Sequence, residues 1–155
     1  TGTFEFQFEG KKLEDAEKWF FNKSDPYFVV ETVESGEVYR SETLRDNLNP
    51  TWSAGIVALM TLCGGDLDKI FTVTTHDENS QDEDEKMGSF ETSVNKMISG
   101  AQGSGVDFNL VLNGEIKGGV YVKLATLSGY QVPSDAARKN MSTVGAAKML
   151  KLEVD

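Results

Sequence analysis

The sequence predicts an all-β domain, an eight-stranded antiparallel β-sandwich. Eight short runs rich in aromatic and β-branched residues follow one another at close spacing, and turns containing glycine, proline or asparagine separate them. No long amphipathic helical pattern occurs before Pro133. With 155 residues, of which 39% are hydrophobic, the chain is long enough to bury an ordinary core as one domain. This combination favours two packed antiparallel sheets.

The N-terminal part of the chain supplies three of the expected strands. They span residues 3–9, 27–33 and 37–45. In the first, Phe4, Phe6 and Phe8 alternate with polar residues, which predicts one buried and one solvent-facing side. Before the second, Pro26 favours an extended backbone at Asp25. Asp25 is therefore expected to be the last loop residue before a strand, with its carboxylate at the end of a sheet.

The other five expected strands follow Pro50. They span residues 52–62, 70–75, 87–94, 106–112 and 120–127. The apolar run 52–62 suits a short buried helix or a strand, and the turn signals at Asn49-Pro50 and Gly64-Gly65 favour the strand. Residues 95–105 are polar and glycine-rich, and we expect a loop there, with room for a helical turn.

We expect the sandwich to occupy residues 1–129 and residues 130–155 to follow it as a C-terminal tail. Ser134 is a candidate cap for a short helix that runs from Asp135 toward Gly145. The tail equally suits a linker into the first strand of a further domain. The chain begins Thr-Gly-Thr without a methionine, which favours a segment of a longer parent protein with other domains.

Charge and composition exclude several classes of function. The formal net charge of −10 argues against nucleic acid as a partner and against direct adsorption to anionic lipid, unless multivalent cations reverse the local sign. A single cysteine, Cys63, rules out an internal disulfide and favours a reducing, cytoplasmic compartment. The longest apolar run, 56–62, is far shorter than the roughly 18 residues of a membrane span. With His76 as the only histidine, no nucleophile–base pairing is visible, so we expect no enzymatic activity.

Two acidic stretches far apart in the sequence each lie at the end of an expected strand. One is Ser24-Asp25-Pro26-Tyr27, and the other runs over residues 76–88. If the fold brings both to the same end of the sandwich, their oxygens can enclose a hard cation. The alternative is that both are solvated turns, in which Asp25 caps nearby backbone amides.

Three motifs, in this order, resemble those of the C2 domain family. Residues 21–27, Phe-Asn-Lys-Ser-Asp-Pro-Tyr, are similar to the family's F-G-x-S-D-P-Y, and residues 49–52, Asn-Pro-Thr-Trp, to its N-P-x-W. Residues 77–79, Asp-Glu-Asn, and 84–88, Asp-Glu-Lys-Met-Gly, are similar to D-x-D and D-D-x-x-G. The resemblance implies the family's sandwich in its second topology, with a first strand directly before the Asp25 loop. The residues around Gly119 to Val122 look most like copine-type C2 domains.

The resemblance also implies a set of calcium ligands on two apical loops. The matching positions are Asp25, Asp77, Asn79 and Glu85, with Asp84, Asp82 and Glu17 as further candidates. The family's first acidic position is occupied here by Trp19, which offers no oxygen. The implied cofactor is therefore calcium at a single weak site, or no calcium at all.

Function follows from the same resemblance. It implies calcium-dependent binding to anionic phospholipid membranes, with the protein moving from the cytoplasm to the membrane surface when calcium rises. Trp19, Phe20 and Phe21 are candidate membrane contacts, because large amphipathic rings on a loop favour the membrane interface; the alternative is that they cover the end of the sandwich. The alternative function is a calcium-independent protein-interaction or scaffold domain, whose acidic loops bind a basic partner.

Overall fold

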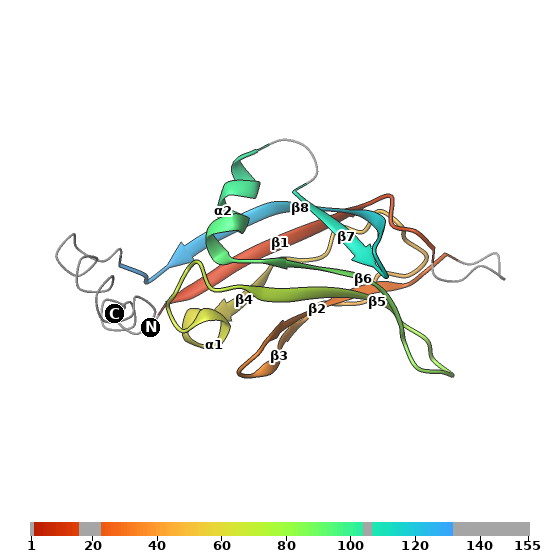
Figure 1. Ribbon diagram of the computed structural model, residues 1–155, viewed down its shortest axis with the longest axis horizontal. Coiled ribbons are helices and arrows are strands. Elements are labelled where there is room, and N and C mark those ends of the chain that lie inside the picture. The colour runs from red at the N-terminus through yellow and green to blue at the C-terminus, as the bar shows by residue number, and fades with distance from the viewer. Residues whose placement is uncertain (1, 16–22, 104–106, 132–155) are drawn as a thin grey trace.

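The structure, a computed structural model, describes residues 2–15, 23–103 and 107–131. Its strands are β1 (Thr3–Lys11), β2 (Pro26–Thr32), β3 (Gly36–Arg40), β4 (Gly55–Ala58), β5 (Phe71–Asp77), β6 (Glu85–Thr92), β7 (Phe108–Leu112) and β8 (Glu115–Ser128). The helices of these residues are α1 (Leu59–Cys63) and α2 (Val94–Gln102) (Figure 1). The predicted fold class, with eight antiparallel strands, is confirmed. Neither described helix is long and apolar enough to cross a membrane.

The strands form one continuous antiparallel order, β3-β2-β5-β6-β7-β8-β1-β4. A single residue pair, Ser89 with Val111, joins β6 to β7, so the order divides there into two layers of four strands. The edge strands β3 and β4 come into contact on the other side. The N-terminal strand β1 lies between β8 and β4 and leads toward the Asp25 segment, as the second topology requires.

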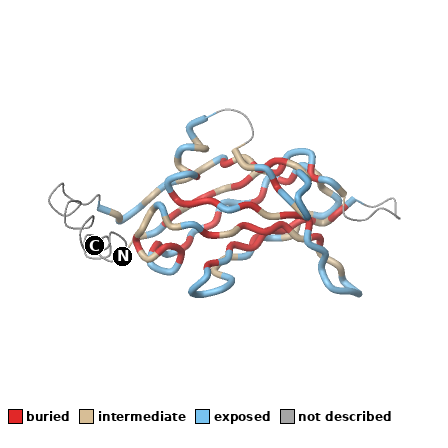
Figure 2. Tube along the Cα trace, viewed as in Figure 1, coloured by how far each residue is buried: buried red, intermediate tan, exposed pale blue. Residues whose placement is uncertain are grey.

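Aromatic side chains fill the space between the two layers. Phe4, Phe6 and Phe8 of β1 are all buried, as their alternation predicted. Figure 2 shows buried residues along the strands and exposed residues mainly in the connecting turns. Phe8 meets Phe28 of the opposite layer edge-to-face, with ring centroids 5.2 Å apart. Trp52, only 1% exposed, packs against the same Phe28 ring at 5.0 Å. These contacts tie the start of β2 firmly to the core, because edge-to-face rings add specific attraction to the area they bury.

Two predictions about the middle of the chain are wrong. The third expected strand was to reach Arg45, but β3 ends at Arg40 and residues 41–54 form a connection that returns along the start of β2. The expected strand 52–62 is strand only over Gly55–Ala58 and then becomes α1. Gly64 ends that helix in the left-handed conformation, with φ of 64°, which a residue without a Cβ adopts at little cost.

The expected loop 95–105 is largely the helix α2. Its start is fixed by Ser93, whose hydroxyl oxygen accepts a hydrogen bond from the Lys96 amide at 3.2 Å. Val94 and Met97 are buried and anchor one side of the helix against the sandwich. The polar composition concealed this helix, and the serine cap followed by two apolar residues at helical spacing was the available signal.

The antiparallel pairing of β2 with β5 places the two acidic stretches side by side. Pro26 is the register partner of Asp77, and the turn between β5 and β6 continues from that point. The segments 23–26, 43–47 and 77–85 therefore lie at the same end of the molecule, hereafter the loop end, at the right of Figure 1. Residues 132–155 lie outside the described residues, so the C-terminal tail stays a prediction.

Candidate functional site

Backbone hydrogen bonds hold three segments of the loop end together. The Glu78 amide donates to the Asp25 carbonyl at 3.0 Å, and the Asn47 amide donates to the Ser24 carbonyl at 3.1 Å. The indole Nε1 of Trp52 donates to the Pro26 carbonyl at 3.2 Å from the core side. The positions of the acidic side chains are thus fixed by the main chain and by the core.

Asp77 is the most deeply placed carboxylate of the loop end. It has no exposed surface, and its Oδ1 accepts a hydrogen bond from the Asp25 amide at 2.8 Å. Its Oδ2 is buried and has no hydrogen-bond partner among the described residues. Burial raises the pKa of Asp77, and the Asp25 amide and the nearby Ser24 hydroxyl offset this only in part. Among the described residues, an ionised carboxylate held in this way has no positive partner.

Asp25 is more exposed than Asp77, and each of its carboxylate oxygens already has a partner. Its Oδ1 accepts from the Asp46 amide at 2.8 Å, and its Oδ2 pairs with Nη1 of Arg45 at 3.3 Å. The same guanidinium places Nη2 3.1 Å from Oε1 of Glu78. The Thr43 hydroxyl donates to the other oxygen of Glu78. The charge of Glu78 and then that of Asp25 raise the pKa of Arg45, so the outer carboxylates have a permanent cation beside them.

Asp84 closes the turn between β5 and β6. One of its oxygens accepts from the Asn79 amide at 2.9 Å, and the other accepts from the Tyr27 hydroxyl. The Tyr27 hydrogen bond lowers the pKa of Asp84, while burial and Asp84 raise the pKa of Tyr27 to about 12. The Asn79 side chain donates through Nδ2 to the Glu83 carbonyl at 3.2 Å. The turn is therefore held in shape by its own polar groups.

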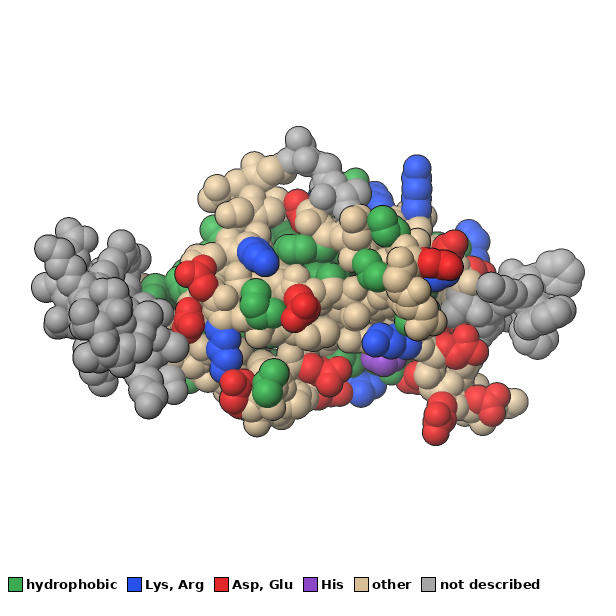
Figure 3. All heavy atoms as spheres, viewed as in Figure 1, with side chains coloured by type: hydrophobic (Ala, Val, Ile, Leu, Met, Phe, Trp, Pro, Cys, Tyr) green, Lys and Arg blue, Asp and Glu red, His purple; other side chains and the backbone are tan. Residues whose placement is uncertain are grey.

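The remaining predicted ligands fall into two groups. Asp82 and Glu85 are exposed, and the structure gives their side chains no hydrogen bond or ion pair with other described residues. Residues 77–85 carry six acidic and no basic side chains. Figure 3 shows acidic side chains at the lower right, where Figure 1 places the turn between β5 and β6. Glu17, Trp19, Phe20 and Phe21 lie outside the described residues.

The donor set suits calcium in its chemistry, although it does not form a complete coordination shell. Within residues 2–15, 23–103 and 107–131, no group of three or more histidine, cysteine or acidic side chains is arranged as a metal centre. Asp77 nevertheless contacts the Asp25 backbone through Oδ1, its Oδ2 has no hydrogen-bond partner among the described residues, and Asn79 keeps a side-chain carbonyl oxygen. Carboxylate and carbonyl oxygens are the ligands that calcium prefers, with water or a further ligand completing the shell.

Sequence reasoning missed Arg45 as a member of this site. The sequence predicted Arg45 only as the last residue of the expected strand 37–45 and gave it no role at the acidic stretches. The turn signal at Asn47 and the proline at Pro50 mark this stretch as a loop, and that was the signal that it could meet the acidic segments.

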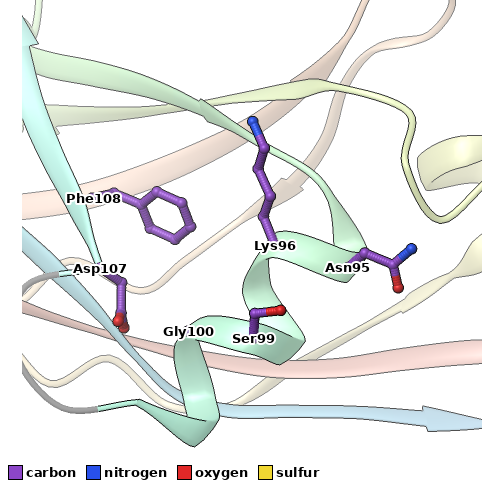
Figure 4. Close-up of a pocket in the computed structure, with 6 residues that line it drawn as sticks. All are labelled: Asn95, Lys96, Ser99, Gly100, Asp107 and Phe108. Carbon is purple, nitrogen blue, oxygen red and sulfur yellow. The ribbon is translucent and has the colours of Figure 1, made fainter.

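A separate hollow lies beside α2, away from the loop end. It is lined by Asn95, Lys96, Ser99, Gly100, Asp107 and Phe108 (Figure 4). Its acidic group is engaged in the fold, because Oδ2 of Asp107 accepts from the Val122 amide at 2.6 Å. Phe108 stacks on Phe90 with ring centroids 4.7 Å apart. Through these two contacts, the acidic and aromatic groups of the hollow join β6, β7 and β8.

Comparison with known proteins agrees with this architecture. A sequence model described as C2 domain matches residues 6–108. The solved structure of BON1-C2B is similar at a TM-score of 0.70 and 23% identity, covering 82% of this chain and 92% of that one. The first C2 domain of plant Extended Synaptotagmin 1 gives 0.54 at 14% identity, over 81% and 91% of the two chains. A pair of C2 domains from Extended-Synaptotagmin 2 gives 0.54 at 18% identity, over 94% and 48%.

Proposed function

Since this chain belongs to the C2 domain family, we propose that it is a non-enzymatic module that binds anionic phospholipid membranes through its loop end when calcium is present. The module is proposed to occupy residues 1–129, with residues 130–155 as a C-terminal tail, a linker or the start of a following element. Such a module is cytoplasmic at low calcium and moves to the membrane surface when calcium rises.

The observation that carries this proposal is the unpaired oxygen of Asp77. A buried polar atom without a partner costs about 1–3 kcal/mol, and such atoms are rare in native structures unless water or an ion satisfies them. A calcium ion beside Asp77 and Asp25 removes that cost. Asn79 contributes its side-chain carbonyl oxygen, and Glu85 contributes a carboxylate from the far end of the turn.

Charge explains why an ion is needed. Residues 77–85 carry six acidic and no basic side chains, so the loop end by itself repels an anionic surface. Bound calcium supplies positive charge and coordination positions that phosphate oxygens of head groups can fill. Trp19, Phe20 and Phe21, in the segment that leads to Asp25, are proposed to reach the lipid interface beside it.

Sedimentation with vesicles tests the proposal. Vesicles of phosphatidylcholine with phosphatidylserine are mixed with the protein in calcium or in chelator, and vesicles of phosphatidylcholine alone are the control. We expect the protein to pellet only with the anionic vesicles and only in calcium. Equal pelleting in calcium and chelator would remove the calcium step, and no pelleting in either would remove the membrane role.

A second candidate function is a calcium-independent protein-interaction domain. The observation that favours it is the pairing of Arg45 with both Asp25 and Glu78, since a site that already contains a cation has less need of calcium. Isothermal titration separates the two functions. A chain that takes up no calcium at millimolar concentration belongs to the second.

A further inference from the structure

We infer that Arg45 is the resident counter-cation of this site, that calcium must displace it from Asp25, and that it thereby sets the calcium concentration at which the module responds. This inference rests on the proposed function, because it assigns a regulator to the same site. It does not depend on which lipid the module binds.

The position of Arg45 is the first step. Its guanidinium nitrogens lie 3.3 Å from the Asp25 carboxylate and 3.1 Å from the Glu78 carboxylate. Arg45 therefore pairs with one member of each acidic stretch. A calcium ion between Asp25 and Asp77 needs the same Asp25 carboxylate. Two cations that share one carboxylate repel each other, so each weakens the binding of the other.

The second step is that Arg45 is easily displaced. Its side chain is 64% exposed, and the structure gives its guanidinium no hydrogen bond to described residues beyond these two acidic partners. Both ion-pair distances are long for a guanidinium with a carboxylate. Exposed pairs of this kind contribute little to folding stability, so moving the side chain into water is an inexpensive step.

The third step is that the carboxylates keep their places when Arg45 leaves. Oδ1 of Asp25 remains bonded to the Asp46 amide at 2.8 Å, and Glu78 remains bonded to the Thr43 hydroxyl. The Leu44 amide donates to the Pro26 carbonyl at 3.0 Å and holds the connection itself. Arg45 therefore contributes charge, and its neighbours in the same connection contribute position.

The experiment compares the full chain with its Arg45→Gln and Arg45→Lys variants. Glutamine keeps a hydrogen-bond donor without the charge, and lysine keeps the charge without the planar fork. Lys69→Gln is the matched control, because Lys69 makes an exposed ion pair with Glu34 at 2.7 Å near the opposite end of the sheet. Calcium affinity is measured by isothermal titration, and thermal unfolding is followed in chelator and in calcium.

We expect Arg45→Gln to bind calcium about three- to tenfold more tightly, because a nearby like charge of this exposure opposes binding by roughly that factor. Its calcium-induced rise in melting temperature should be correspondingly larger. Arg45→Lys and Lys69→Gln should bind calcium as the unaltered chain does. Unchanged or weaker calcium binding by Arg45→Gln, with its fold shown intact by thermal unfolding, would overturn the inference.

Vesicle sedimentation of the same proteins separates the two ideas. Tighter calcium binding by Arg45→Gln without any pelleting on anionic vesicles supports the role of Arg45 and refutes the membrane function. Calcium-dependent pelleting of all variants at one calcium concentration supports the membrane function and refutes the role of Arg45. Absence of calcium uptake by every variant refutes both.

Discussion

Asp77 and Asp84 lie near opposite ends of the same acidic turn, and they differ in burial and in hydrogen bonding. Asp77 is buried, accepts one hydrogen bond from the Asp25 amide and leaves its second oxygen without a partner among the described residues. Asp84 is exposed, and each of its oxygens accepts a hydrogen bond, from the Asn79 amide and from the Tyr27 hydroxyl. Accordingly, the pKa of Asp77 is raised by burial and that of Asp84 is lowered by its donors.

This difference separates two uses of one residue type. A carboxylate whose oxygens are both bonded shapes the turn and gains stability from its charge. A carboxylate that is buried with one oxygen unpaired loses stability from its charge, and a cation bound beside it would remove that loss. The acidic composition of residues 77–85 makes the two residues look equivalent, and only their partners distinguish them.

The largest expected effect comes from removing Trp52, the core residue that holds the start of β2 at the loop end. Trp52→Ala should lower the free energy of unfolding by about 3–5 kcal/mol, because it deletes a buried ring that packs on Phe28 and bonds the Pro26 carbonyl. Urea unfolding in chelator measures the loss. Val33→Ala is the control, since Val33 is 97% exposed and its truncation should change little. A loss below about 1 kcal/mol for Trp52→Ala would show that Trp52 does not support the loop end.

Asp77→Asn removes the buried charge that distinguishes Asp77 from Asp84. The calcium-induced rise in melting temperature should disappear, because the buried charge that attracts the ion is gone. In chelator the variant should be more stable than the unaltered chain by about 1 kcal/mol, since an uncharged amide avoids the cost of a buried, unpaired carboxylate oxygen. Glu83→Gln, an equal charge change in the same turn, is the control and should keep the calcium response. A full calcium response in Asp77→Asn would contradict the assignment.

The extra stability that Asp77→Asn should have in chelator is expected to depend on pH. Because the pKa of Asp77 in the folded chain lies above its ordinary value of 3.8, the unaltered chain is favoured at low pH and loses this stability as pH rises through the raised pKa. The advantage of Asp77→Asn in chelator should therefore be largest at neutral pH and shrink on acidification. Urea unfolding from pH 7 toward about pH 4 measures it. An advantage that grows on acidification would mean that the Asp77 charge stabilises the fold.

The sequence predicted the frame of this site better than its chemistry. The Pro26 break and the β-branched and aromatic runs 27–33 and 70–75 predicted the two strands that place Asp25 beside Asp77, because strand composition and turn chemistry are local signals. The family resemblance drawn from three motifs is confirmed. The pairings of Arg45 with Asp25 and of Tyr27 with Asp84 were not predictable, because these contacts join residues 20 and 57 positions apart and depend on tertiary packing.

The smallest expected effect tests the other side of the comparison. Tyr27→Phe removes the hydroxyl that bonds Asp84 and should cost about 1 kcal/mol at pH 7, the usual contribution of a hydrogen bond to a carboxylate in a partly exposed place. Because this bond lowers the pKa of Asp84 below its ordinary 3.8, its contribution is present above that pH and is lost as pH falls through the lowered pKa. Acidification should therefore bring the stabilities of Tyr27→Phe and the unaltered chain together. Tyr121→Phe is the control, because the structure gives the Tyr121 hydroxyl no hydrogen bond to described residues. A cost that persists unchanged in acid would assign the effect to packing of the Tyr27 ring against His76, 5.3 Å away, instead of to Asp84.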